Sequence, residues 1–358
     1  MHECTPLMIL QSASSELSSK VRARECRAKD RKSRVEELTY YQTIPSRTIV
    51  ITIRTERVGH AQELTQVAKK GSRVAILKGS LMVVSVNGAE LFYATRGTGY
   101  PCIVPCILGT KVYERLTPPP LTDHFNFVYV DLRGGGRSTG DPADLTFEML
   151  ASDLDDVRAD LGVTRVAVLG YSILGVVALE YARRSPETVS HVITAGTPPT
   201  GDLEELVKAS MAFFAADGSQ ERKTILQENM AKLPPGTPPT HAVFAQTPMR
   251  FFDPRFDAVS LLAESQFNAR LFEHVLKLTG QWNVLTGVES LHVPILLAHG
   301  RYDYAVPFTM WNEVVDKVPN ATLHLFERSG HQPFFEEPAQ FAEVVLAWMA
   351  RAAAATRQ

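Results

Sequence analysis

Apolar runs typical of buried strands alternate with helical patterns from about residue 82 onward. Asn87-Gly88, a strong hairpin signal, separates two β-rich runs at the beginning of this region. The segment TFEMLASDLDDVRADLGV carries apolar residues at positions 147, 150, 154, 157 and 161, a spacing typical of a helix. Further strand-like runs are CIVPCIL, FNFVYV, RVAVLG, VSHVITA, PILLAHG and ATLHLF. This alternation predicts an α/β protein with a mostly parallel sheet covered by helices on both faces.

The alternation stops between about residues 200 and 288. Helical patterns and proline-rich breaks such as LPPGTPPT fill this stretch, and the strand signal resumes with VPILLAHG. We therefore expect an α/β core formed by residues 81–199 and 289–350, interrupted by a helical insertion at 200–288.

Residues 1–80 follow a different pattern. Basic residues crowd positions 20–34 and large apolar ones are almost lacking there, which favours a solvated or partly disordered arm. A nucleic-acid-binding tail is the less favoured alternative, because no aromatic residues are interleaved with the charges. TIVITI at 48–53 predicts a strand, and AQELTQVAKK at 61–70 predicts a short helix. This region is expected to be a poorly defined N-terminal extension.

Composition places the chain among ordinary soluble proteins. Its 358 residues are 45% hydrophobic and 21% charged, with a formal net charge of −2. The charge gives no global field that would attract nucleic acid. The beginning of the chain lacks a secretory pattern, and no apolar run approaches the roughly 20 residues that span a bilayer. We expect a cytoplasmic protein that binds neither nucleic acid nor membrane, with the oligomeric state open between monomer and homodimer.

The cysteines and glycine-rich loops do not indicate a metal or a cofactor. Cys102 and Cys106 lack a second Cys/His pair at zinc spacing, so we expect them to be buried strand thiols. RGGGRSTG is rich in glycine, but it matches neither the G-x-G-x-x-G pattern nor the P-loop pattern. No cofactor and no metal site are therefore expected.

Ser172 stands between a strand-like run and a helical pattern in VAVLGYSILGVVALEYA. That is the context of a nucleophile elbow, whose usual pattern is G-x-S-x-G. Gly170 fits the pattern, whereas Leu174 occupies the last glycine position and Gly175 comes one residue later. The alternative is a serine that only caps the helix. The context favours Ser172 as a nucleophile.

Asp303 and His331 each follow a later strand-like run, in LLAHGRYDYAVP and ERSGHQPFFEEP. A serine nucleophile needs a base and a group that orients the base, and the carboxyl ends of parallel strands lie at one edge of the sheet. The order Ser, Asp, His is the order expected for such a fold. A turn aspartate and a surface histidine are the alternatives, and His299 is expected in the core or just behind the site.

Four segments, DLRGGGRSTG, GYSILGVVALEYARRSPETVSHVI, PILLAHGRYDYAVP and ERSGHQPFFEEPAQFAEVVLAW, together resemble the α/β-hydrolase superfamily. Within it they resemble the capped esterase and proline-iminopeptidase-like branch, over about residues 82–349. The resemblance implies an α/β-hydrolase fold with a cap at 200–288. It also implies that Ser172 is the nucleophile, Asp303 the orienting acid and His331 the general base. Asp131 and Arg133 match a loop of the family that we interpret as structural.

The chain departs from the family at the oxyanion loop. Cys106-Ile107 stand where the family usually has His-Gly. A main-chain N–H needs no particular side chain, so the hole can form without them. Ile173 is expected to give the first N–H donor and Leu108 the second, with Ile107 as the alternative.

The predicted cap carries two sets of residues that bear on the substrate. Some of its Met and Phe residues are expected to line an apolar pocket and the others to form the cap core: Met211, Phe213, Phe214, Met230, Phe244, Met249, Phe251, Phe252 and Phe256. Its glutamates could hold a substrate amino group, as an aminopeptidase requires, but a solvated helical face is favoured: Glu204, Glu205, Glu221, Glu228, Glu264 and Glu273.

These observations predict a serine hydrolase, a carboxylesterase that cleaves small to medium apolar esters through an acyl-enzyme on Ser172. A proline-iminopeptidase-like or carbon–carbon bond hydrolase is the alternative within the family. A ligand-binding protein that keeps a weakly active hydrolase fold is the alternative of another class, because the oxyanion loop is altered. The sequence leaves open the physiological substrate, the acyl-chain preference and the role of residues 1–80.

Overall fold

An eight-stranded sheet lies at the centre of the region from residue 81 onward. The computed structural model describes residues 4–7, 19–27, 33–44, 47–58, 61–70, 73–76, 81–237, 243–262 and 264–355. The sheet has the order β14-β13-β12-β11-β9-β10-β8-β7, and the neighbouring pairs among β9 to β14 are parallel. Its strands are β7 (Leu81–Val86), β8 (Ala89–Gly97), β9 (Tyr100–Cys106), β10 (Phe125–Asp131), β11 (Val166–Tyr171), β12 (Val189–Ala195), β13 (Ile295–Gly300) and β14 (Ala321–Phe326).

Strands β7 and β8 form the hairpin that Asn87-Gly88 predicts. These two residues make the turn between the strands, and Gly88 has a φ of 74°, the left-handed conformation that glycine adopts without strain. The hairpin occupies one edge of the sheet, so the parallel strands are left to carry the loops that form the site.

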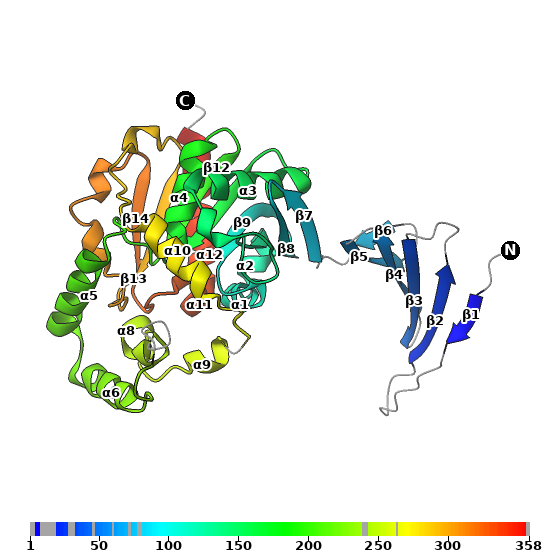
Figure 1. Cartoon of the computed structure of the whole chain (residues 1–358), viewed down its shortest axis with the longest axis horizontal. Helices are drawn as coiled ribbons and strands as arrows, with labels where there is room; N and C mark the ends of the chain where they lie inside the picture. The colour runs from blue at the N-terminus through cyan, green and yellow to red at the C-terminus, as the bar shows by residue number, and fades with distance from the viewer. Residues whose placement is uncertain are drawn as a thin grey trace. The chain divides into compact units, whose positions relative to one another are not determined.

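Helices cover the sheet on both faces, as the alternation of patterns predicts (Figure 1). Helix α3 (Phe147–Asp160) begins at Thr146, whose hydroxyl accepts a hydrogen bond from the Met149 N–H at 3.0 Å, and it packs against α4 (Leu174–Arg184). Helix α2 (Leu121–His124) packs against α12 (Pro338–Ala355). The shorter helical segments are α1 (Thr110–Leu116), α11 (Pro333–Glu336), η1 (Pro142–Asp144), η3 (Val288–Ser290), η4 (Phe308–Trp311) and η5 (Val315–Lys317).

Between β12 and β13 the described residues form helices and loops, with one isolated bridge between Thr200 and Asn283. Figure 1 shows α6, α8 and α9 gathered away from the sheet. Here α6 packs against η2 and α8, and α10 contacts η1. The division into core and cap stays a prediction. The segments are α5 (Leu203–Asp217), α6 (Gln220–Ala231), η2 (Val243–Gln246), α8 (Thr247–Arg250), α9 (Ala258–Leu261) and α10 (Ala269–Thr279).

The N-terminal region differs from two expectations. It holds a six-stranded antiparallel sheet in chain order, which contains the predicted strand at 48–53. The helix expected at 61–70 is wrong, because that segment is a strand paired along the Val- and Ile-rich β4. The basic segment expected to be an arm contributes strand β2. Both corrections have one cause, since strand formation depends on the paired neighbour more than on local preference. The strands are β1 (Cys4–Leu7), β2 (Ser19–Arg27), β3 (Ser33–Ile44), β4 (Arg47–Val58), β5 (Ala61–Lys70) and β6 (Arg73–Ile76).

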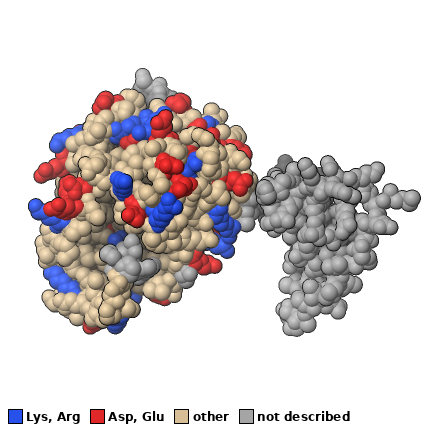
Figure 2. All heavy atoms as spheres, viewed as in Figure 1, with Lys and Arg blue, Asp and Glu red and all other residues tan. Residues whose placement is uncertain are grey.

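Contacts divide the chain into two units. One contains residues Met1–Val83 and Ala94–Arg96, and the other contains Val84–Tyr93 and Gly97–Gln358. On the face of the second unit that Figure 2 shows, Lys and Arg are interspersed with Asp and Glu. No helix in the described part of the chain is long and apolar enough to cross a bilayer.

Candidate active site

Ser172 occupies a strained turn between β11 and α4. Its φ is 54°, a left-handed conformation that is uncommon for a residue with a side chain. Its N–H donates to the Ala195 carbonyl at 2.8 Å, and its own carbonyl accepts from the Gly175 N–H at 2.9 Å. These bonds hold the backbone where strand changes to helix, so the unusual conformation persists.

The glycines on either side of Ser172 allow a close approach of backbone segments. A Cβ on Gly170 would lie 2.5 Å from the Gly175 Cα, and a Cβ on Gly175 would lie 1.9 Å from the Thr197 Oγ1. Gly175 therefore allows the close packing that the usual motif obtains from a glycine one position earlier, at residue 174. Leu174, at that earlier position, is buried and forms part of a pocket wall.

The structure brings Ser172, His331 and Asp303 together. The Nε2 of His331 lies 3.0 Å from the Oγ of Ser172, and its Nδ1 lies 2.7 Å from the Oδ2 of Asp303. The three residues follow β11, β14 and β13 at the carboxyl edge of the sheet. The Asp303 and His331 side chains are 0% and 1% exposed, so bulk water does not compete for their hydrogen bond.

The Asp303 carboxylate is fixed by the turn that follows it. Its Oδ1 accepts hydrogen bonds from the N–H groups of Ala305 at 3.1 Å and Val306 at 2.9 Å. The other oxygen is then directed at His331. This is the backbone bonding expected of a turn aspartate, and here it orients the carboxylate rather than replacing its contact with the histidine.

A main-chain hydrogen bond and a ring contact hold His331 in place. Its N–H donates to the Arg250 carbonyl at 2.6 Å, and its ring centre lies 5.1 Å from that of Tyr171. The preceding Gly330 N–H donates to Glu336 Oε1 at 2.8 Å. Glu336 Oε2 accepts from the Phe252 N–H at 2.6 Å, and burial raises the pKa of Glu336 to about 7. Glu336 thus links the histidine loop to the segment after α8.

The two expected oxyanion donors have free N–H groups. Within the described residues, neither the Leu108 N–H nor the Ile173 N–H has a protein acceptor. The Ile107 N–H lies 3.4 Å from the Tyr113 hydroxyl, which makes Leu108 the freer of the two alternatives. The next residue, Gly109, has a φ of 86°, so this loop keeps a glycine two positions after the expected one.

A pocket of about 410 Å³ opens at Ser172 and His331. Its walls are mostly apolar, and both residues expected to form the oxyanion hole line it. The lining residues are Ile107, Leu108, Tyr113, Tyr171, Ser172, Ile173, Leu174, Arg250, Leu262, Ser265, Phe267, Phe272 and His331.

Comparison with known proteins identifies the family. Residues 102–338 match the family described as alpha/beta hydrolase fold. The chain belongs to the alpha/beta hydrolase family. It is 29% identical over 274 residues to the AB hydrolase superfamily protein YclE of Bacillus subtilis, covering 74% of this chain and 96% of that protein. It is 26% identical over 248 residues to a pimeloyl-[acyl-carrier protein] methyl ester esterase of Klebsiella pneumoniae, covering 68% and 90% of the two chains.

Solved structures agree with the fold of this hydrolase. The proline iminopeptidase of Mycobacterium smegmatis superposes with a TM-score of 0.60 at 21% sequence identity, covering 77% of this chain and 100% of that one. The predicted superfamily and fold class are therefore confirmed.

The apolar residues singled out for the pocket are not the ones that line it. Of the nine Met and Phe residues named from the sequence, none lines the pocket in the described residues, and the Phe244 side chain lies outside them. Phe214 and Met249 instead form a buried cluster with Tyr304. Leu262, Phe267 and Phe272 take their place in the pocket wall. Phe272 lies on α10, whereas Leu262 and Phe267 lie in the segment between α9 and α10.

The glutamates of the hydrolase's helical insertion are solvated. All six that the sequence analysis named are exposed, and the described lining residues of the pocket include neither Asp nor Glu. A solvated helical face is therefore confirmed for the five that lie on α5, α6 and α10, whereas Glu264 is exposed in the turn between α9 and α10.

The residues interpreted as structural lie outside the pocket. Arg133 donates two hydrogen bonds to Asp153, at 2.6 and 3.0 Å, in a buried ion pair. Asp131 is fully buried, accepts from the Arg137 N–H at 2.9 Å, and has its pKa raised by burial to about 6. Neither side chain is among the described lining residues of the pocket at Ser172.

The other titratable residues of interest are core residues. Cys102 and Cys106 are buried free thiols, as predicted. His299 is fully buried, and its burial lowers its pKa to about 4. It therefore stays neutral at physiological pH, in the core behind Asp303.

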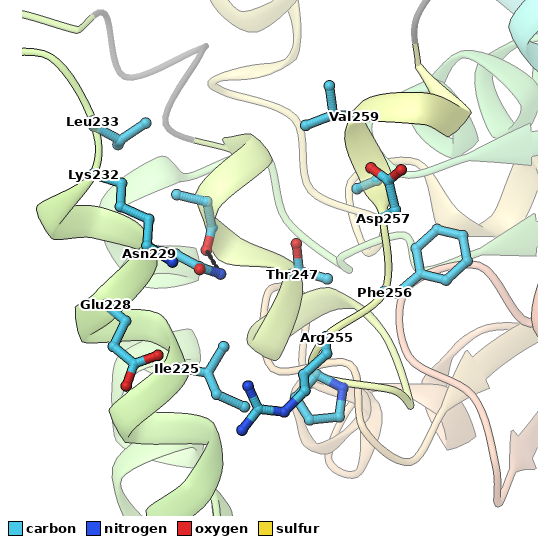
Figure 3. A pocket seen from close by; sticks show the side chains of 13 residues that line it. Ile225, Glu228, Asn229, Lys232, Leu233, Thr247, Arg255, Phe256, Asp257 and Val259 are labelled. Carbon is cyan, nitrogen blue, oxygen red and sulfur yellow. Dashed lines mark hydrogen bonds between the residues drawn. The ribbon is translucent and has the colours of Figure 1, made fainter.

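A second pocket, of about 380 Å³, lies within the insertion (Figure 3). Side chains of α6 form one side of it, with Asn229 donating to the Ala245 carbonyl at 3.3 Å, and Phe256, Asp257 and Val259 form another. Among the lining residues that the structure describes, none is shared with the pocket at Ser172, and none forms a nucleophile and base pair at hydrogen-bond distance.

Proposed function

We propose that this hydrolase is a serine carboxylesterase that works through an acyl-enzyme on Ser172. The observation that carries the proposal is the hydrogen-bonded chain from the Ser172 hydroxyl through His331 to Asp303, at 3.0 and 2.7 Å, beside an apolar pocket. A serine that only caps a helix needs neither a buried histidine at its hydroxyl nor a strained φ.

The first half of the reaction forms the acyl-enzyme. The Ser172 oxygen attacks the ester carbonyl carbon while its proton moves to His331 Nε2, and Asp303 stabilises the resulting imidazolium. The carbonyl oxygen becomes an oxyanion, which the N–H groups of Ile173 and Leu108 stabilise. The tetrahedral intermediate then collapses, the bond to the alcohol oxygen breaks, and His331 gives that oxygen the proton.

The second half repeats the steps with water. His331 takes a proton from a water molecule as its oxygen attacks the acyl carbon, and the same two N–H groups receive the oxyanion. Breaking the bond to Ser172 releases the carboxylic acid, and the proton returns from His331 to the serine oxygen. No redox partner or added cofactor enters this balance.

The pocket favours an ester with apolar parts over a peptide with a free amino group. An aminopeptidase needs a carboxylate to pair with the substrate ammonium, and the described pocket residues offer none. Leucine, isoleucine and phenylalanine side chains instead form most of the wall. One relative bears the name of a methyl ester esterase, which agrees with an ester substrate.

The proposal is tested by steady-state hydrolysis of short-chain 4-nitrophenyl esters with the Ser172→Ala variant. We expect kcat to fall by about 10⁴-fold or more, because no other group can form the acyl-enzyme. Ser185→Ala, at the other end of α4, is the matched control and is expected to keep the wild-type rate.

Two results would decide against an esterase. Retention of activity in Ser172→Ala would remove Ser172 as the nucleophile. Faster cleavage of proline 4-nitroanilide or of a dienoate substrate than of any simple ester would favour the peptidase or carbon–carbon bond hydrolase instead.

A further inference from the structure

One cationic side chain lies among the apolar walls of the active-site pocket. Arg250 ends α8, in the helical insertion, and lines the pocket together with Ser172 and His331. No other Lys, Arg, Asp or Glu appears among the lining residues that the structure describes.

The Arg250 guanidinium has few partners within the protein. One of its terminal nitrogens lies 3.4 Å from the Gln246 Oε1, which is long for a hydrogen bond, and its Nε is buried without a partner. No ion pair joins it to a carboxylate of the described residues. A partly buried cation without a counter-ion is unfavourable, so its presence calls for an explanation.

Three other arginines of this protein have charged or main-chain partners. Arg133 pairs with Asp153, and Arg301 pairs with Asp217 at 2.8 Å. The buried Arg222 donates to three main-chain carbonyls, those of Pro248, Phe251 and Phe252. By comparison, most N–H donors of the Arg250 guanidinium have no protein acceptor among the described residues.

The backbone and the side chain of Arg250 make separate contacts. Its carbonyl accepts the His331 N–H at 2.6 Å, which fixes the residue beside the histidine whatever its side chain is. The guanidinium acts on the Tyr171 phenol, lowering its pKa against the larger opposing effect of burial. Tyr171 lines the pocket, so the positive charge lies next to the pocket wall.

We infer that the substrate carries a carboxylate, apart from its ester bond, which the Arg250 guanidinium binds in the pocket. The inference rests on the proposed esterase function and narrows its substrate class to anionic esters, such as a half-ester of a dicarboxylic acid. The planar guanidinium offers paired donors that match a carboxylate, and a low-polarity wall strengthens their attraction. The apolar wall holds the carbon chain between the two ends.

The test compares esters that differ only in this charge. The mono-4-nitrophenyl esters of adipic and suberic acid are compared with the same esters carrying a carboxamide in place of the distal carboxylate. Butanoate esters of 4-hydroxybenzoate and 4-hydroxybenzamide place the same difference on the alcohol side. Rates are corrected for spontaneous hydrolysis, and the ratio of kcat/KM for the anionic ester to that for its neutral partner is the readout.

The wild-type ratio is expected to favour the anionic ester in at least one series. Arg250→Met should lower that ratio by about 10- to 100-fold, mainly through KM, as expected for loss of a charge-assisted hydrogen bond. Arg250→Lys should retain part of the preference, because it keeps the charge but not the paired donors. Arg255→Met, at an exposed arginine outside this pocket, is the matched control and should keep the wild-type ratio. Circular dichroism checks that each variant is folded.

A binding measurement separates failure of this inference from failure of the proposed function. Calorimetry with the Ser172→Ala protein is expected to show adipate binding more tightly than adipamide, and Arg250→Met in that background should abolish the difference. Ester hydrolysis that depends on Ser172 but shows no charge preference in any series would overturn the inference alone. Adipate binding that depends on Arg250, without hydrolysis of any ester, would uphold the anion site and overturn the esterase.

Discussion

The positive φ of Ser172 lies between two glycines, Gly170 and Gly175, that allow close backbone packing. The strand-like run before Ser172 and the helical pattern after it were sufficient to predict the turn, although the last glycine is displaced by one position. The structure gives the reason why the displacement is tolerated. Gly175 is the residue that meets Thr197, whereas Leu174 points to the pocket side and has room for a side chain. Sequence alone could not assign that contact, because Thr197 belongs to the loop after the next strand.

Replacing Gly175 by alanine is expected to destabilise the protein. The added methyl would lie 1.9 Å from Thr197 Oγ1, so either the start of α4 or the Thr197 loop must shift. We expect the free energy of unfolding to fall by about 1–3 kcal/mol, as overpacking usually costs, measured by urea denaturation. Gly280→Ala is the matched control, since its Cβ would come no closer than 3.2 Å to another atom. Equal stability of the two variants would contradict the tight contact.

The site lies at the carboxyl ends of three strands, β11, β13 and β14. The alternation of strand and helix patterns predicted β11, β13 and β14, and therefore the meeting of Ser172, Asp303 and His331. The wall of the pocket could not be predicted in the same way. Whether Phe213, on α5, or Phe267, in the loop before α10, faces the pocket depends on how the insertion packs against the core, which no local pattern records. The position of Arg250 in the pocket could not be predicted either, because nothing in its surrounding sequence distinguishes it from a surface arginine.

The contact between the loop after β10 and helix α3 depends on a buried ion pair. Arg133→Met would leave the Asp153 carboxylate buried without its partner, and breaking such a pair costs about 3–5 kcal/mol of stability. The loss should appear as a lower midpoint in urea denaturation. The double variant Arg133→Met/Asp153→Leu should recover much of it, because no unpaired charge remains. A double variant less stable than Arg133→Met would show that the pair does not act as described.

Glu336 ties α11 to the histidine loop and to the segment after α8, and its effect on stability should depend on pH. Its pKa is raised from 4.5 to about 7 in the folded protein, chiefly by burial. Between these pH values the folded protein holds a proton that the unfolded chain has released, so this group's contribution to stability falls as pH rises through that window.

The variant Glu336→Gln removes this titration. Relative to the wild type, it should therefore gain unfolding free energy as the pH rises from 4.5 to 8, measured by urea denaturation at several pH values. Glu204→Gln, on the exposed face of α5, should follow the wild type throughout. A variant that instead loses unfolding free energy relative to the wild type as the pH rises would contradict the raised pKa.

At the scale of the whole molecule, the fold could be predicted where local patterns agree with the final packing. The region from residue 81 onward is such a case, since its strands and helices lie where their patterns place them. The N-terminal region is not, because the segment Ala61–Lys70 forms a strand through its pairing with β4 despite a helix-like composition. The family match, over residues 102–338, and the site both fall in the region from residue 81 onward.

The central claim, that this hydrolase forms a covalent bond through Ser172, is tested most directly by mass spectrometry after reaction with a fluorophosphonate. Among the described lining residues of the pocket, two are serines, Ser172 and Ser265, and of these two only Ser172 has a base at its hydroxyl. We predict one adduct per chain, mapped to the peptide that contains Ser172 and absent from Ser172→Ala. An adduct on Ser265, or no adduct on the folded wild-type protein, would contradict the account.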